Sequence, residues 1–120
     1  MSGFTLKSNH ILTEEGFRSG YLTVEDGKIA AVSSEYSGTY EDLGDLSIYP
    51  GLIDIHNHGF GGWSMTDPCE ETDIRGYAKA VTSVGITGIL PTAKESAFRA
   101  SARVMDGESE GARVVGIHSE

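Results

Sequence analysis

Two histidines separated by a single residue are the feature of this sequence that most clearly points to chemistry. His56 and His58 close an apolar run and are followed at once by Gly59. Because successive side chains of a strand point to opposite faces, both imidazoles should lie on one face, about 6.6 Å apart along the backbone. Neutral imidazole is the commonest metal ligand in proteins. The pair therefore predicts a site where two imidazoles bind one metal ion, and two ordinary surface or hydrogen-bonded histidines are the alternative.

The run before the histidines has the composition of a buried strand. Pro50 suits the first residue of a strand, and the apolar residues Leu52, Ile53 and Ile55 are typical of a strand covered on both faces. Asp54 interrupts this run. Burying an isolated carboxylate costs free energy, so Asp54 should be hydrogen-bonded, face the ligand end of the strand, or accept a hydrogen bond that orients a histidine ligand.

A glycine-rich segment follows the histidines. Gly59, Gly61 and Gly62 can adopt positive φ angles and allow a ligand to approach the backbone closely, so we expect a substrate to lie against them. A merely tight turn is the alternative. The segment lacks the Lys-Ser or Lys-Thr pair of a phosphate-binding loop.

Further polar residues follow two later apolar segments. Thr92 comes after segment 88–90, and His118 and Glu120 come after segment 112–117. If these segments are parallel strands, their carboxyl ends share one rim with His56 and His58. His118 would then contact a substrate, or hydrogen-bond to the metal ligands without binding the metal itself. A packed, hydrogen-bonded histidine is the alternative.

The pattern of the first 48 residues predicts β-structure. Short β-prone runs at 4–6, 20–24 and 28–33 alternate with turns, and Asp26-Gly27 is a hairpin turn signal between the last two. Such meandering pairs suit part of a β-sandwich, whereas a hairpin appended to an α/β core is the alternative. We place the domain boundary near Pro50, with residues 1–49 in the small domain and 50–120 in the next.

After residue 50 the pattern changes to alternating strands and helices. We expect a helix over 70–84 ended by Gly85, a strand over 88–90 ended by Pro91, a helix over 93–105, and a strand over 112–117. This rhythm is typical of a parallel sheet with right-handed crossovers, either in a barrel or in an open sheet. The residues expected to face the core are Ile74, Tyr77, Ala78, Val81 and Val84 in the first helix, and Phe98, Ala102 and Met105 in the second.

Composition narrows the class of protein. The 120 residues include 18 acidic and 9 basic side chains, a formal charge of -9 that disfavours a nucleic-acid partner. The single cysteine, Cys69, cannot form an intramolecular disulfide, and its acidic neighbours should raise the pKa of its thiol. We expect a cytoplasmic protein, because neither a signal peptide nor a membrane-spanning segment is recognisable in these residues.

Three motifs together resemble the amidohydrolase superfamily, and within it the N-acetylglucosamine-6-phosphate deacetylase family. The motifs are Pro50-Gly51-Leu52-Ile53-Asp54-Ile55-His56-Asn57-His58-Gly59, then Gly85-Ile86-Thr87-Gly88-Ile89-Leu90-Pro91-Thr92, and finally Gly116-Ile117-His118-Ser119-Glu120. The first is shared by many amidohydrolases, and the other two point to the deacetylase branch.

The resemblance implies a metal-dependent (β/α)8 TIM barrel preceded by part of a small β-sandwich. It implies one or two divalent ions, zinc or iron, with Glu120 joining His56 and His58 as a ligand. The implied reaction hydrolyses the acetamide of an amino sugar phosphate, and the implied general base is an aspartate on a later strand, beyond residue 120.

A TIM barrel needs about 250 residues, so we expect this chain to be the start of a longer protein or to associate with further protein, as a homo-oligomer or with the remaining part. Two other functions stay open. One is a dihydroorotase-like or hydantoinase-like amidohydrolase, which would use a carboxylated lysine where this chain has Glu120. The other is a noncatalytic metal-binding or assembly fragment.

Overall fold

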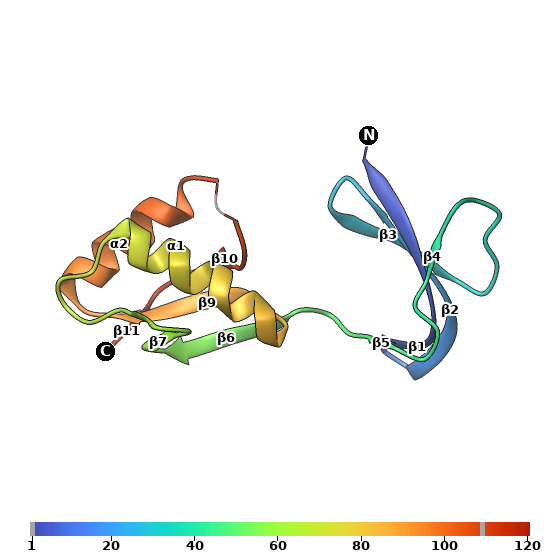
Figure 1. Cartoon of the computed structure of the whole chain (residues 1–120), viewed down its shortest axis with the longest axis horizontal. Helices are drawn as coiled ribbons and strands as arrows, with labels where there is room; N and C mark the ends of the chain where they lie inside the picture. The colour runs from blue at the N-terminus through green and yellow to red at the C-terminus, as the bar shows by residue number, and fades with distance from the viewer. Residues whose placement is uncertain (1, 109) are drawn as a thin grey trace. The chain divides into compact units, whose positions relative to one another are not determined.

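The computed structural model describes residues 2–108 and 110–120, and the chain divides into two compact units. Unit 1 comprises the residues up to Pro50, and unit 2 is Gly51–Glu120. Both are rich in strands, and the helices belong to unit 2 (Figure 1). The chain is therefore of the α/β class, with strands predominating among the described residues. No helix in the described part of the chain is both long and apolar enough to cross a membrane.

Unit 1 is a five-stranded sheet. Its strands are β1 (Gly3–Thr13), β2 (Gly16–Glu25), β3 (Lys28–Ser33), β4 (Glu41–Asp42) and β5 (Ser47–Ile48). The first three form an antiparallel meander, and β4 and β5 pair parallel to β1. The predicted turn is present, with φ of 48° at Asp26 and 75° at Gly27.

The strands β1 and β2 are longer than predicted. β1 continues through polar residues that carry no β-pattern, because pairing with β2 and side-chain hydrogen bonds hold them there. Ser8 is buried; its hydroxyl donates to the Leu46 carbonyl at 2.5 Å and accepts the His10 N–H at 2.9 Å. The length of β1 thus depends on residues far away in the sequence.

Unit 2 is built on a parallel sheet, as the alternating pattern predicted. The strands are β6 (Leu52–Asn57), β9 (Ile86–Ala93), β10 (Arg113–Val114) and β11 (His118–Ser119), and β6, β10 and β11 each pair parallel to β9. The other elements are the hairpin of β7 (Gly59–Phe60) and β8 (Trp63–Ser64), helix α1 (Glu71–Ala80), the 3-10 helix η1 (Val81–Val84) and helix α2 (Glu95–Met105).

The core of unit 2 lies between the sheet and the two helices, which cover one face of β9 (Figure 1). Its largest buried side chains are Tyr77, Ile74, Ile89, Val81 and Val104. Helix α1 begins after Glu70, whose backbone N–H donates to the Asp73 carboxylate at 2.8 Å, while the Asp73 N–H donates to the Glu70 backbone carbonyl at 3.0 Å.

Pro91 does not end the second strand, contrary to the prediction. β9 continues to Ala93, and Pro91 lies opposite a bulge in β6: the pairing advances two residues on β9, from Ile89 to Pro91, and three on β6, from Asp54 to Asn57. A proline is tolerated at a bulge because the ladder is already interrupted there. The predicted strand over 112–117 is also wrong in extent, since β10 covers only Arg113–Val114 and Val115 is 46% exposed.

Helix α2 faces the core with a different stripe from the one predicted. Its buried residues are Ala97, Ala100, Ser101 and Val104, whereas Phe98 and Met105 are exposed and Ala102 is only half-buried. Small side chains face inward because α2 packs against both α1 and β9. Choosing the largest apolar side chains of this helix therefore predicted the wrong core-facing residues.

The first helix is predicted more accurately, with one error at its end. Ile74, Tyr77, Ala78 and Val81 are buried as expected, but Val84 is 50% exposed. The last turn, Val81–Val84, is a 3-10 helix with 3.0 residues per turn, which rotates its final side chain off the core stripe. Gly85 then ends the helix with φ of 82°, as predicted.

The prediction that β6 is covered on both faces is wrong for the described residues. Leu52, Ile53 and Ile55 are 60–63% exposed. Among the described strands, β6 pairs only with β9, and the helices contact other parts of unit 2.

Candidate metal centre

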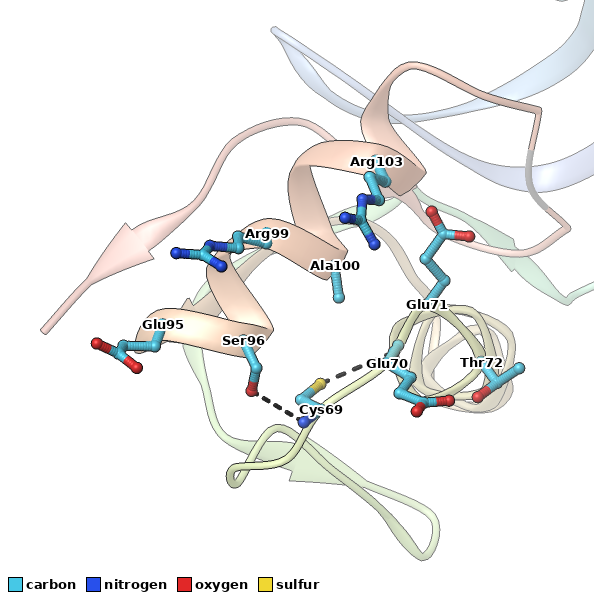
Figure 2. A pocket seen from close by; sticks show the side chains of 9 residues that line it. All are labelled: Cys69, Glu70, Glu71, Thr72, Glu95, Ser96, Arg99, Ala100 and Arg103. Carbon is cyan, nitrogen blue, oxygen red and sulfur yellow. Dashed lines mark hydrogen bonds between the residues drawn. The ribbon is translucent and has the colours of Figure 1, made fainter.

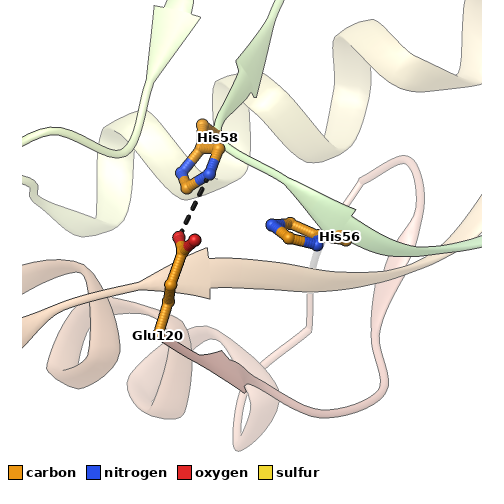
Figure 3. Close-up of side chains that lie close together, drawn as sticks. All are labelled: His56, His58 and Glu120. Atoms are coloured by element: carbon orange, nitrogen blue, oxygen red, sulfur yellow. Dashed lines mark ion pairs between the residues drawn. The ribbon is translucent and has the colours of Figure 1, made fainter.

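His56, His58 and Glu120 come together at one end of the parallel sheet (Figure 3). Each offers one ligand atom, and these atoms all lie within 4.8 Å of one another. Nε2 of His58 is 3.2 Å from a carboxylate oxygen of Glu120, and the two histidine rings lie 5.5 Å apart between centroids. The three residues, which we call the HHE cluster, are exposed.

The geometry of the HHE cluster fits a divalent metal. Donors around a tetrahedral zinc ion lie about 3.3 Å apart at bond lengths near 2.0–2.1 Å, so small side-chain rotations would bring these three atoms to one ion. Two imidazole nitrogens and a carboxylate oxygen are a ligand set that zinc and iron accept. An ordinary surface pair of His58 and Glu120 would add little stability by itself.

Asp54 supports the histidines through hydrogen bonds. One carboxylate oxygen accepts the His56 backbone N–H at 3.1 Å, and the other accepts the Asn57 side-chain amide at 2.8 Å. The Asn57 side-chain oxygen in turn accepts the Gly59 N–H at 2.8 Å. Asp54 and Asn57 thus shape the backbone on both sides of His56 and His58.

Thr92 also acts on this segment. Its side chain is buried, and its hydroxyl oxygen accepts the Asn57 backbone N–H at 3.0 Å. Sequence reasoning selected Thr92 and Asp54 but missed Asn57, which connects them. The signal for Asn57 was its position between two histidines. An amide there can donate a hydrogen bond to a carboxylate earlier in the chain and accept one from a backbone N–H later in the chain.

His118 lies beside the HHE cluster without belonging to it. Its ring centroid is 4.3 Å from that of His56, and its Nδ1 lies 2.8 Å from the Ile55 carbonyl oxygen. The parallel pairing of β11 with β9, His118 opposite Thr92, places it there.

A pocket of about 270 Å³ adjoins the HHE cluster. Two members of the cluster, His58 and Glu120, form part of its wall. The remaining lining residues are Met65, Thr66, Asp67, Thr92, Ala93 and Lys94. It offers hydroxyls from Thr66 and Thr92, charges of both signs from Asp67 and Lys94, and the apolar side chains of Met65 and Ala93.

Comparison with known proteins identifies the chain's relatives. It is 33% identical over 132 residues to the N-acetylglucosamine-6-phosphate deacetylase of Bacillus subtilis, a match that covers 96% of this chain and 33% of the relative. Its fold matches the deacetylase of the same name from Mycobacterium smegmatis, solved with N-acetyl-D-glucosamine-6-phosphate, with a TM-score of 0.67 and 24% identity over 89% of this chain and 31% of that one.

The chain is similar to the amino-terminal part of an N-acetylglucosamine-6-phosphate deacetylase. It spans about a third of the length of these relatives. It is also 34% identical over 89 residues to the allantoinase of Streptomyces avermitilis, which covers 70% of this chain and 18% of the allantoinase. No protein-family model matches the chain. The resemblance to the deacetylases seen in the sequence is confirmed.

The glycine-rich segment of this deacetylase-like chain forms a small hairpin. Gly61 and Gly62 make the turn between β7 and β8, with φ of 63° and 87°. A side chain at Gly61 would contact Ala80 of α1, and neither these two residues nor Gly59 lines the pocket beside the HHE cluster. Contact of Gly59, Gly61 and Gly62 with a substrate therefore remains a prediction.

Cys69 lies in a second hollow, of about 560 Å³, between the start of α1 and one side of α2 (Figure 2). Burial raises the pKa of its thiol, and the carboxylates of Asp73, Asp67 and Glu70 raise it further. The prediction of a raised pKa is confirmed, which disfavours a nucleophilic thiolate. This hollow shares no lining residue with the pocket beside the HHE cluster.

Proposed function

We propose that the chain provides the amino-terminal part of a metal-dependent deacetylase that hydrolyses N-acetylglucosamine 6-phosphate to glucosamine 6-phosphate and acetate. The similarity to the Bacillus subtilis deacetylase over 96% of the chain supports this substrate and reaction. The single structural observation that carries the proposal is the HHE cluster at the carboxyl ends of parallel strands, where α/β proteins place their active sites.

We assign His56, His58 and Glu120 as ligands of one or two divalent ions, zinc or iron. A bound ion would lower the pKa of a coordinated water towards about 7 and polarise the amide carbonyl. Asp54 and Asn57 hold the histidine segment, and Thr92 fixes the Asn57 backbone. The pocket beside His58 and Glu120 would receive part of the substrate, while the general base is expected from an aspartate that lies outside this chain.

The two units fit this proposal. We assign residues 1–49 to a small β-sandwich domain and residues 50–120 to the first strands and helices of a TIM barrel. The parallel order β6, β9, β10 supports the barrel assignment, and the antiparallel meander of unit 1 suits a sheet of the sandwich. The exposed side chains of β6 would contact further protein, either a second copy or the rest of the enzyme. We place the protein in the cytoplasm, where a single free cysteine is usual.

A cyclic-amide hydrolase is the second candidate, because the allantoinase of Streptomyces avermitilis matches 70% of the chain. Both candidates use water activated by a metal, but Glu120 in the HHE cluster, where the second candidate would have a carboxylated lysine, favours the deacetylase. They differ in the bond that is cleaved and in the product.

The test uses the protein purified at its natural length. We expect it to release acetate from N-acetylglucosamine 6-phosphate and to prefer this substrate to the unphosphorylated sugar, because a phosphate supplies binding energy away from the amide. Turnover of allantoin or dihydroorotate without acetate release would overturn the deacetylase assignment.

Metal content tests the ligands separately. His56→Ala and His58→Ala should each lower the metal affinity by more than roughly 10–100-fold, the loss that is typical when a residue that only hydrogen-bonds to a metal ligand is mutated. His10→Ala is the matched control, because His10 is an exposed histidine of unit 1 outside the HHE cluster. Unchanged metal stoichiometry in both cluster variants would remove the pair from the site.

A further inference from the structure

We propose that His118 is a positioning residue of the metal centre, which clamps the peptide group between Ile55 and His56 and limits rotation of the His56 ring. The inference rests on the proposed function, because it assumes that His56 binds a metal. It assigns to His118 a task in organising a ligand rather than in binding the ion.

The regular pairing of β6 with β9 is interrupted at the residues that His118 contacts. The pairing of β6 with β9 passes from Asp54 directly to Asn57, so Ile55 and His56 have no register partner on β9. The backbone that carries a metal ligand is therefore not held there by a regular ladder. A bulge of this kind redirects a side chain, and it needs other contacts to fix the new direction.

Side chains hold this peptide group at both of its polar ends. Its N–H, on His56, donates to the Asp54 carboxylate at 3.1 Å, and its carbonyl, on Ile55, lies 2.8 Å from Nδ1 of His118. The orientation of the peptide plane sets the direction in which the His56 side chain leaves the backbone. Asp54 and His118 together therefore determine where the imidazole of His56 points.

The hydrogen bond also fixes the proton on His118. A carbonyl oxygen can only accept, so Nδ1 must donate, and the neutral ring then carries its lone pair on Nε2. The ring lies against His56, with 4.3 Å between centroids and 42° between planes. The same side chain thus restrains both the backbone and the ring of His56.

Three substitutions separate the clamp from general packing. The amide nitrogen of Asn occupies roughly the place of His Nδ1, whereas that of Gln corresponds to Nε2. His118→Asn keeps a donor for the Ile55 carbonyl but loses the ring beside His56, so we expect it to lose less zinc affinity than the other two variants. His118→Gln and His118→Ala should lose roughly 10–100-fold, the usual effect of removing a residue that supports a metal ligand. Zinc affinity would be measured by competition with a chromophoric chelator, on the protein at its natural length, with thermal midpoints as a check on folding.

The outcomes distinguish this inference from the proposed function. Equal affinity in all three variants, or an equal loss in all three, would overturn the clamp while the His56 and His58 variants still report on the centre. Failure of the wild-type protein to bind either zinc or iron would instead overturn the metal assignment. Nitrogen NMR of the metal-free protein then decides the clamp alone: a neutral His118 protonated on Nδ1 supports it, and one protonated on Nε2 overturns it.

Discussion

The neighbouring strands β9 and β6 have similarly apolar sequences but opposite environments. Ile89 and Ala93 of β9 are at most 3% exposed, whereas Ile53 and Ile55 of β6 are each 63% exposed. β9 has strands on both sides and helices over it, while β6 pairs with β9 alone among the described elements. Whether an apolar strand is buried therefore depends on the elements that pack around it, and its apolar sequence alone does not decide this.

The largest effect should come from truncating the covered strand. Ile89→Ala removes a fully buried side chain and should lower the free energy of unfolding by about 2–5 kcal/mol, through lost apolar burial and the cavity left behind. Ile53→Ala on β6 is the matched variant. It should cost less than about 1 kcal/mol if β6 is as exposed in solution as in the described residues, and more if further protein covers β6 as we propose. Urea denaturation of both measures the difference. A similar loss in the two variants would mean that β6 is covered in solution.

A second prediction concerns the layer over β9. The Trp63 ring lies directly against Gly76 of α1, so that a methyl group there would collide with the indole. Gly76→Ala should therefore destabilise the protein by about 1–3 kcal/mol, although alanine is the better helix former by about 1 kcal/mol. Gly107→Ala is the control, because its added methyl group would meet only ordinary contacts. A more stable Gly76 variant, or a loss as small as that of the control, would show that Trp63 does not pack there.

The smallest effect concerns the buried hydroxyl of Tyr77, which finds no hydrogen-bond partner among the described residues. Tyr77→Phe should be neutral or stabilising by up to about 1 kcal/mol at pH 7, because it removes a polar group that is buried without compensation. Chemical denaturation at pH 7 checks this. A loss of more than about 1 kcal/mol would reveal a partner for the hydroxyl.

The same variant has a signature in alkaline solution. Burial, and then the charge of Asp54, raise the pKa of Tyr77 to about 12. The folded state therefore retains the phenolic proton after the unfolded state begins to lose it near pH 10, and the stability contributed by this group falls as the pH rises from 10 towards 12. The advantage of Tyr77→Phe over wild type should grow across this range, and a constant difference would contradict the pKa shift.

The sequence predicts the elements of both units well where the pattern is local. The helix stripe of Ile74, Tyr77 and Val81, the stop at Gly85 and the turn at Asp26-Gly27 all depend on nearby residues, and all are confirmed. The errors arise where distant residues decide. Pro91 is tolerated within β9 because of a bulge in β6. The core-facing residues of α2 are small because this helix packs against both α1 and β9.

The site shows the same division. The type and spacing of His56 and His58 could be recognised from the sequence, and so could the common rim of strand ends. The peptide clamp could not, because it depends on a bulge that no local pattern encodes. Asn57 was overlooked because its importance comes from partners on both sides of it and on β9.

The bond between His118 and Ile55 joins residues 63 positions apart. It closes a loop that contains α1, β9 and α2, so the contact exists only when these elements bring the end of β11 beside β6. A metal that joins His58 to Glu120 would cross-link the two ends of the same stretch of chain. Such a cross-link stabilises the folded unit selectively, because the ion binds the folded state and not the unfolded chain. The free energy of unfolding would then rise with metal concentration, independently of any reaction the protein supports.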